Sequence, residues 1–230
     1  MGVMIGAQSM VAVVFVVMAA VQHQAKRGAP LPVEELKRAL AADPLLLSLS
    51  VLVSIPAVWL ALWAIISFRK GPRFRDYLAL RGFRPTHFLL WLGALVGVVS
   101  AGDWFVQAMG DTSGSTFMLN LLDAGRHLPL LVVALVVGAP VLEEVLFRGF
   151  MYRGMAASWR GAAILVPNVF WVVLHVQYAW PTLTVLFFMG LVFGLARQFS
   201  GSTLLPLTLH VVSNAISIFV ALEMAGQTPP

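Results

Sequence analysis

The sequence predicts an all-α membrane protein built as a bundle of about seven transmembrane helices, and three observations lead to this prediction. Of the 230 residues, 60% are hydrophobic and only 11% are charged. The mean hydropathy is +0.89. Such a chain has too little polar surface to cover a soluble core, which excludes a soluble globular enzyme. Its apolar residues also form blocks of about the 20 residues that a helix needs to cross a bilayer.

Seven apolar blocks fit transmembrane helices, and the fourth is expected to continue as a helix toward Ala157. Residues 1–21 lack the basic start and the small-residue cleavage site of a signal peptide, so we expect them to remain as the first span. The chain is expected to form one membrane domain, with 1–127 as its N-terminal part and 128–230 as the part richest in buried polar residues. The predicted spans are 3–21, 45–67, 88–109, 128–147, 161–178, 182–199 and 204–223.

Two polar stretches lie between the first three spans. Pro32 can begin a short helix with Val33, Leu36 and Leu40 on one face, which we expect either to lie on the membrane surface or to be a solvated connector. The second stretch, 69–84, is basic and either marks the cytoplasmic side of the membrane or contacts anionic lipid headgroups. Its basic residues are Arg69, Lys70, Arg73, Arg75, Arg81 and Arg84.

The distribution of charge predicts an orientation and excludes nucleic acid as a partner. The net charge is +5, but the basic residues are spaced between apolar blocks and form no patch for a nucleic acid. Loops on one side of the predicted membrane hold ten Lys and Arg residues and loops on the other side hold five. This bias favours a cytoplasmic N-terminus and an external C-terminus. We therefore expect an integral, multi-pass protein of the bacterial plasma (inner) membrane, surrounded by lipid.

Composition and spacing give two further constraints. The chain has no Cys, which excludes disulfides and thiolate chemistry. Gly93 with Gly97 and Gly190 with Gly194 are pairs at a spacing of four residues. Small residues at this spacing let two transmembrane helices approach closely, so we expect helix contacts at both pairs.

Ionisable residues inside a span indicate where to look for function, because they are costly in lipid and usually face a protein interior or a cavity. Glu144 and Arg148 are four residues apart, in the order that favours an ion pair on one helix face. Glu143 lies about 100° around the helix from Glu144 and remains the freer carboxylate. The polar sets are Glu143, Glu144 and Arg148 in the fourth span, His175 at the end of the fifth, and His210 with Asn214 in the seventh.

These residues are expected to share one depth in the membrane. If the fourth and fifth spans form a hairpin that turns near Trp159, Glu143 and His175 each lie sixteen residues from the turn. In the last hairpin, Asn214 lies about fourteen residues, or about 20 Å, beyond its turn. His210 and Asn214 are four residues apart and therefore project from one helix face toward a common point.

A carboxylate, two imidazoles and an amide at one level are suitable groups for a hydrolytic site. Glu143 would act as general base for water, a histidine would share the proton, and donors would face the developing oxyanion. Glu143, His175 and His210 are also a suitable set of ligands for a zinc ion with one open position. The residues alone leave both chemistries open, because no H-E-x-x-H helix is present.

Three motifs around these residues resemble those of the CAAX protease and bacteriocin-processing (CPBP, or Abi) family of intramembrane proteases. The family motifs are E-E-x-x-x-R, F-x-x-x-H and H-x-x-x-N. In this chain they read EEVLFR at 143–148, WVVLH at 171–175 and HVVSN at 210–214. Trp171 stands where the family has Phe. It keeps an aromatic ring on the helix face of the histidine, so we expect it to change the shape of the pocket more than the chemistry.

The resemblance covers about 128–222 and implies a polytopic membrane endopeptidase with its catalytic core in the last four spans. It implies that Glu143 activates water with help from His175, and that His210 and Asn214 stabilise the oxyanion. Family members have been described both as metal-dependent and as glutamate-type proteases. Asn214 is a natural oxyanion donor and a poor zinc ligand, which favours a glutamate-type enzyme without a cofactor, with zinc as the alternative. The supporting residues would be Glu144, Arg148 and Trp171.

Family substrates include prenylated CAAX proteins, bacteriocin precursors and C-terminal sorting segments, so we expect a membrane-associated protein or peptide as substrate. The predicted orientation brings the catalytic layer nearer the outer face, which disfavours a cytosolic prenylated tail. A proton-coupled transporter is one alternative, since Glu and His in a span also mark ion pathways, but no internal repeat is visible. A non-catalytic scaffold or immunity protein is the other, and its activity would survive substitution of Glu143.

Overall fold

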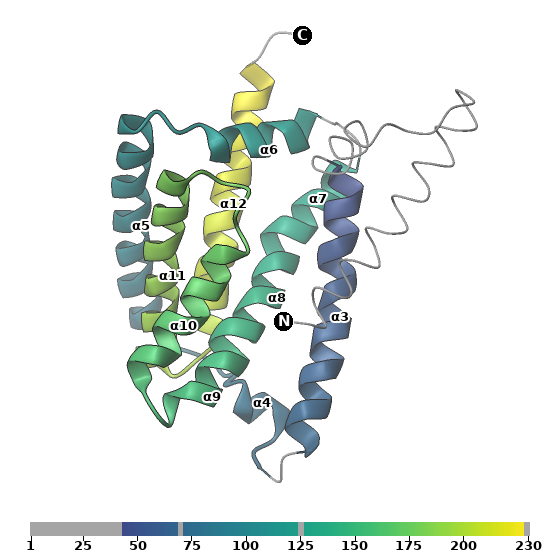
Figure 1. Ribbon diagram of the computed structural model, residues 1–230, viewed down its shortest axis with the longest axis vertical. Helices are drawn as coiled ribbons and strands as arrows, with labels where there is room; N and C mark the ends of the chain where they lie inside the picture. The colour runs from purple at the N-terminus through teal and green to yellow at the C-terminus, as the bar shows by residue number, and fades with distance from the viewer. Residues whose placement is uncertain (1–42, 69–70, 124–126, 228–230) are drawn as a thin grey trace, which may run out of the picture.

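The computed structural model describes residues 43–68, 71–123 and 127–227, and every regular element among them is a helix (Figure 1). Five helices are long and apolar enough to cross a membrane, and a further apolar helix is shorter. The protein is therefore an integral, multi-pass membrane protein of the predicted all-α class. The predicted span 3–21 and the helix after Pro32 lie outside the described residues. The long helices are α3 (Pro44–Phe68), α5 (Pro85–Ala108), the composite helix Leu128–Ala156, α11 (Trp180–Ser200) and α12 (Leu204–Gln227).

The bundle has two ends that differ in charge (Figure 1). At one end, α6 (Ser113–Asp123) runs across the bundle, and we call this the far end. The opposite end holds α4 (Phe74–Tyr77) and the turns that follow the composite helix and α11. We call it the basic end, because the exposed arginines of the described chain gather there, as the positive-inside rule expects of a cytoplasmic face. They are Arg73, Arg75, Arg81, Arg84, Arg153 and Arg160.

Helix α11 is central to the packing, because it contacts α5, α12 and α10 (Arg160–Val173). The predicted close approach at Gly190 and Gly194 is confirmed, since a Cβ at either position would collide with a side chain of α10. The same prediction is wrong for Gly93 and Gly97, which have open space beside them. These two glycines of α5 therefore bring no described helix closer.

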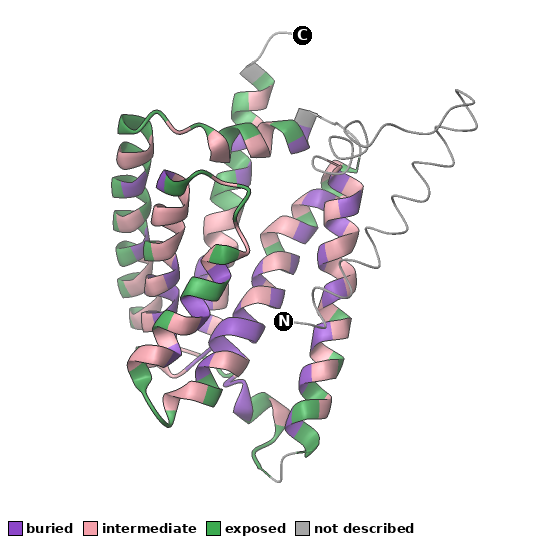
Figure 2. Cartoon of the chain, in the orientation of Figure 1, coloured by how far each residue is buried: buried purple, intermediate pink, exposed green. Residues whose placement is uncertain are grey.

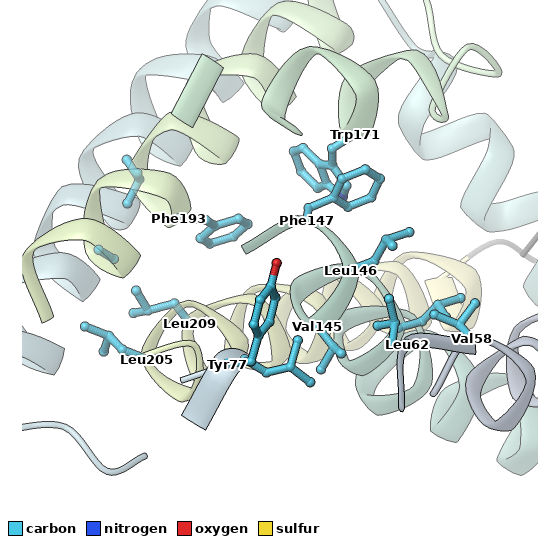
Figure 3. Close-up of a cluster of buried hydrophobic side chains, with 14 of the residues drawn as sticks. Val58, Leu62, Tyr77, Val145, Leu146, Phe147, Trp171, Phe193, Leu205 and Leu209 are labelled. Atoms are coloured by element: carbon cyan, nitrogen blue, oxygen red, sulfur yellow. The ribbon is translucent and has the colours of Figure 1, made fainter. Parts of the chain in front are cut away.

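The main core lies toward the basic end, where α3, α4, the composite helix, α10, α11 and α12 meet. Figure 3 shows its side chains, among them Phe147, Trp171 and Phe193, which are at most 1% exposed. Buried residues line the inward helix faces, whereas α5 is largely uncovered (Figure 2). Large apolar side chains such as Leu89 and Trp104 are exposed on α5. A surface of this kind suits lipid as its solvent.

The predicted fourth span and its continuation toward Ala157 are confirmed, but the composite helix contains two π-helical segments. In η1, the N–H of Ala139 bonds to Ala134 O and not to Leu135 O, and the next residue, Pro140, has no N–H. The Leu135 carbonyl is left free for a partner from another helix. The segments are α7 (Leu128–Val133), η1 (Ala134–Gly138), α8 (Ala139–Glu144), η2 (Val145–Met151) and α9 (Tyr152–Ala156).

The second π segment releases a carbonyl in the same way. The N–H of Tyr152 bonds to the carbonyls of Phe147 and Gly149, whereas an α-helix would direct it to Arg148 O. Arg148 O instead accepts a hydrogen bond from Nε of Arg197 at 3.0 Å. A side chain of α11 thus satisfies a backbone group that would be costly to leave unpaired in a membrane.

Helix α10 is shorter than the predicted span 161–178, because it ends at Val173. The reason lies in the side chain of His175. Its Nδ1 lies 2.8 Å from Trp171 O, the carbonyl that the His175 N–H would use in a continuing helix, and that N–H turns to Val172 O at 2.9 Å. A side chain that competes for a backbone acceptor ends a helix locally, and hydropathy does not register this.

Residues 71–84 form a fixed cover over the basic end. Leu78 is fully buried and belongs to the main core. Thr203, just before α12, donates from Oγ1 to Leu78 O at 2.6 Å. Arg81 donates from Nε to Gly201 O at 2.7 Å, and Gly201 has the positive φ of 67° that ends α11. The predicted basic loop is therefore anchored to the bundle at residues 77–79 and through Arg81, while its arginines Arg73, Arg75, Arg81 and Arg84 remain exposed.

Candidate active site

A buried ion pair lies at the centre of the candidate site. Arg148 donates from Nη1 to Oε1 of Glu144 at 3.1 Å, and the two side chains are 2% and 0% exposed. Its Nη2 donates to Gly190 O of α11 at 3.1 Å. The guanidinium also lies 5.0 Å from the ring centre of Trp171. The predicted pairing of these two charges is thus present, and the pair joins the composite helix to α11.

Gly190 and Asn168 form a close contact between α11 and α10 beside this pair. Asn168 donates from Nδ2 to Phe187 O at 2.9 Å. Its Oδ1 would lie only 1.7 Å from a Cβ at position 190, so a residue larger than glycine would displace Asn168. Asn168 is a residue of the site that the motifs did not indicate, although it is a polar side chain in a predicted span.

His210 of α12 lies between the two carboxylates. Its Nδ1 lies 3.0 Å from Oε1 of Glu144, and its Nε2 lies 3.9 Å from Oε2 of Glu143. A carboxylate only accepts hydrogen bonds, so we assign the Nδ1 proton to the bond with Glu144. The ring of Phe193 stacks on the imidazole with 4.9 Å between ring centres. Glu144 therefore fixes the ring of His210 while His210 Nε2 faces Glu143.

Glu143 is the more accessible of the two carboxylates, as the sequence predicted for the freer one. Its side chain is 16% exposed, against 0% for Glu144. The indole Nε1 of Trp171 donates to Oε2 of Glu143 at 2.5 Å. The expectation that Trp171 changes the shape of the pocket more than the chemistry did not include this hydrogen bond, which a phenyl ring could not donate.

Trp171 contacts both His175 and Glu143. The ring of His175 lies 4.9 Å from that of Trp171, and its Nδ1 bonds to Trp171 O. Since a carbonyl only accepts, Nδ1 carries the proton and Nε2 of the neutral ring is free to take one. Within the described residues, no hydrogen bond or ion pair joins His175 directly to Glu143. The predicted neighbourhood is present, with the indole ring between the two side chains.

Asn214 shares a face of α12 with His210 but does not share its partners. Its Nδ2 donates at 2.8 Å to Leu135 O, the carbonyl released by η1. Both residues thus contact the composite helix, His210 at Glu144 and Asn214 at Leu135, about two and a half turns nearer the far end. The two side chains therefore have different hydrogen-bond partners, because the π segment supplies Asn214 with an acceptor of its own.

The alternative zinc site is not assembled by these side chains. Across 43–68, 71–123 and 127–227, no three His, Asp or Glu residues lie close enough to hold one metal ion. Among the proposed ligands, Glu143 accepts from Trp171 and His210 bonds to Glu144. The donor set does not fit a zinc site, and we derive no step through a metal.

The arrangement suits acid–base chemistry at one carboxylate. Glu143 is partly exposed and oriented by an indole N–H, and the imidazoles of His175 and His210 both pack against that indole. The ring of His210 is 5.6 Å from Trp171 and perpendicular to it. A positioned carboxylate with imidazoles nearby can remove a proton from water and pass it on.

Comparison with known proteins points to the same region. Residues 125–216 match the family described as type II CAAX prenyl endopeptidase Rce1-like. The chain is also similar to a protein of Escherichia coli described as an uncharacterized 24.3 kDa protein, with 32% identity over 137 residues. That similarity covers 56% of this chain and 62% of the relative. No solved structure matches. The family match contains all three motifs identified in the sequence.

Proposed function

Because the chain belongs to the CAAX protease and bacteriocin-processing (CPBP/Abi) family, we propose that it is an intramembrane endopeptidase acting on a membrane-associated protein. The observation that carries this proposal is the environment of Glu143. It is a partly exposed carboxylate in a membrane helix, held by Trp171 and faced by His210. A carboxylate with a purely structural role would be fully buried and paired with a cation, as Glu144 is and Glu143 is not.

In the proposed reaction, Glu143 takes a proton from a water molecule whose oxygen attacks the carbonyl carbon of the scissile bond. Nε2 of His175 shares that proton and delivers it to the amine nitrogen as the C–N bond breaks. His210, with Glu144 as its counter-ion, donates from Nε2 to the oxyanion in its doubly protonated form. The family resemblance adds the second amide N–H of Asn214 as a donor. The proposed enzyme is glutamate-type and uses no metal.

Two features of the fold support entry from the lipid or the far end. Residues 71–84 cover the basic end. Helix α10 has 14 residues and is about 21 Å long, shorter than the roughly 30 Å hydrocarbon core of a bilayer. The non-helical chain from Leu174 to Ala179 therefore begins within the membrane, which is tolerated where backbone lines a water-filled cavity or is covered by protein. His175 lies at the start of this chain.

This access suits a substrate with a hydrophobic or lipidated segment. If the basic end is cytoplasmic, as the charge bias predicts, the scissile bond would approach from the outer side. A protein cut after translocation fits this geometry better than a cytosolic prenylated tail does.

The test is to compare membrane-protein termini by mass spectrometry in cells carrying wild type, Glu143→Ala or Glu144→Ala at matched expression. We expect specific new termini with wild type and their loss with Glu143→Ala. The residues around each new terminus would identify the substrate and the membrane face. If both variants leave every terminus unchanged while a phenotype of the gene persists, a non-catalytic scaffold is the better account.

A further inference from the structure

His175 is the site residue with the least support from its own helix. It lies in a turn, two residues beyond Val173, the last residue of α10. Its hydrogen bond to Trp171 O fixes which ring nitrogen carries the proton. One hydrogen bond leaves the plane of an imidazole free to tilt, so the faces of the ring need packing to hold it.

Tyr178 supplies that packing on the far-end side. The rings of His175 and Tyr178 are stacked, with 6.2 Å between ring centres and 18° between planes. The N–H of Tyr178 also bonds to His175 O at 3.1 Å, which closes the turn between them. His175 is thus packed against Trp171 and Tyr178.

Tyr178 is in turn backed by Phe117 of α6. Their rings meet edge to face, with 5.5 Å between centres and 87° between planes, an arrangement that aromatic rings prefer. Two rings in series, Phe117 and Tyr178, therefore connect α6, at the far end, with the imidazole of the candidate site. Phe117 is 58 residues before His175 in the sequence, and no motif marks it.

Helix α6 is fixed at both of its ends. Near its start, Asp111 accepts from the N–H and the Oγ1–H of Thr182 in α11, at 3.1 and 2.6 Å. Ser113 accepts from the N–H of Ala179 at 2.9 Å. Near its end, Leu121 is 1% exposed and belongs to a second core cluster with residues of the composite helix and α12. Phe117 therefore projects from an anchored helix.

We propose that Tyr178, backed by Phe117, is a positioning residue that holds the imidazole of His175 in the orientation needed for proton transfer. This inference rests on the proposed function, because it gives His175 its role in that reaction. In this role the two rings act through His175. The hydrogen bonds from Thr182 to Asp111, in the α5–α6 turn, hold α6 in place and thereby position Phe117 against Tyr178.

The test uses purified protein in proteoliposomes and a substrate identified by its cellular processing. Tyr178→Leu removes the stacked ring, and we expect kcat to fall by about 10- to 100-fold with little change in KM, since misplacing a catalytic group by about 1 Å has an effect of this size. Tyr178→Phe restores the ring and should recover most of the lost kcat. Phe117→Leu should lower kcat less than Tyr178→Leu, because it acts one ring further away.

A matched control keeps a general loss of packing apart from a loss of positioning. Phe199→Leu removes a ring that stacks on Trp91 with 6.0 Å between centres, in the last turn of α11 near the basic end. It should leave kcat and KM unchanged. Circular dichroism melts of all four variants identify any that fail to fold, and such a variant is replaced by the corresponding methionine substitution.

A second measurement does not depend on protease activity. The imidazole resonances of His175, in protein labelled at histidine and assigned through His175→Gln, should shift in Tyr178→Leu because the ring current and the packing of the tyrosine are removed. They should move less in Phe117→Leu and not at all in Phe199→Leu. Unchanged resonances in a folded Tyr178→Leu protein overturn the positioning role. Moved resonances with no cleavage by wild type overturn the proposed function and leave the packing of His175 established.

Discussion

The indole N–H of Trp171 donates a hydrogen bond to Oε2 of Glu143 at 2.5 Å. The position that carries Trp here carries Phe in the family motif, and a phenyl ring cannot make this bond. The same indole packs against His175 and His210. Trp171, the residue that departs from the family motif, thus contacts the carboxylate of Glu143 and both imidazoles.

Trp171→Phe should separate orientation of the carboxylate from packing of the pocket. The ring is retained and the donor to Glu143 is lost, so we expect kcat to fall about tenfold because the base is less well oriented. The melting temperature should stay near that of wild type. Initial rates in proteoliposomes measure the first quantity, and Trp91→Phe is the matched control. A wild-type kcat in Trp171→Phe would contradict a role for the indole N–H.

Glu144→Ala and Arg148→Met should each destabilise the protein strongly. Removing either partner leaves a buried charge unpaired, which costs about 3–5 kcal/mol in free energy of unfolding. The double variant should lose less than the sum of the two single losses, because no charge is left alone. Denaturant titration in micelles measures all three. Additive losses would mean that the two side chains act independently.

Asn214→Ala should loosen η1, because Leu135 O loses the donor that replaces its helical partner. The expected cost is about 1 kcal/mol for one interhelical hydrogen bond in a membrane. Asn214→Asp should act alike, since a carboxylate has no hydrogen to donate. Hydrogen exchange over Leu128–Glu144 should become faster in both. A fall in kcat with unchanged exchange would instead assign Asn214 to the oxyanion alone.

The hydrogen bonds from Thr182 of α11 to Asp111, beside the start of α6, should weaken only in strong acid. Burial alone would raise the pKa of Asp111, but hydrogen bonds from Thr182 and Ser113 outweigh it and lower the pKa from 3.8 to about 2. A depressed pKa contributes stability that is present above the ordinary value and is lost as the pH falls through the lowered one. The melting temperature should therefore fall as the pH drops from 3.8 toward 2.

Asp111→Asn should remove this part of the acid dependence. An amide cannot become a charged acceptor, so the variant should be less stable than wild type at neutral pH and approach it in acid. Asp103→Asn, which changes an exposed carboxylate bonded to Gln107, is the control. If the melting temperatures of wild type and Asp111→Asn change in parallel across this pH range, the charge of Asp111 contributes nothing to stability.

Chelators should leave the rate of cleavage unchanged. The side chains of the alternative zinc site bond to protein partners, and the described residues bring no three such ligands together. EDTA and 1,10-phenanthroline, each applied to wild-type protein in proteoliposomes, provide the measurement. Loss of cleavage that added zinc restores would refute the glutamate-type mechanism.

Periodicity and spacing predicted the features that depend on neighbours along one helix. The apolar blocks located the five long helices, and the i, i+4 spacing of Glu144 and Arg148 predicted their ion pair. The Gly190 contact was foreseen because small residues permit close approach. The hydrogen bonds of Trp171 and Asn168 were not, because they join different helices and depend on packing that no local pattern contains.

Other differences arise where a side chain or a proline alters the backbone. The imidazole of His175 takes the carbonyl that would have continued α10, so the helix ends five residues before the predicted limit of its span. Pro140 has no N–H, and η1 forms before it. The amide of Asn214 then donates to Leu135 O in η1 and shares no hydrogen-bond partner with His210. Hydropathy and helical spacing assume a uniform α-helix and cannot anticipate either change.

The π segment η1 also affects how this chain tolerates the gain or loss of a residue. A π turn uses more residues than an α turn, so deleting one residue such as Val136 would let the backbone return to ordinary α pairing. Because a π turn fits about one more residue than an α turn into the same rotation about the axis, the residues beyond the deletion would keep nearly the same direction. Glu143 would still face Trp171, whereas the same deletion within an α segment would rotate every later residue by about 100°. The π segment therefore lets this helix lose one residue ahead of the site without misplacing the motif that follows.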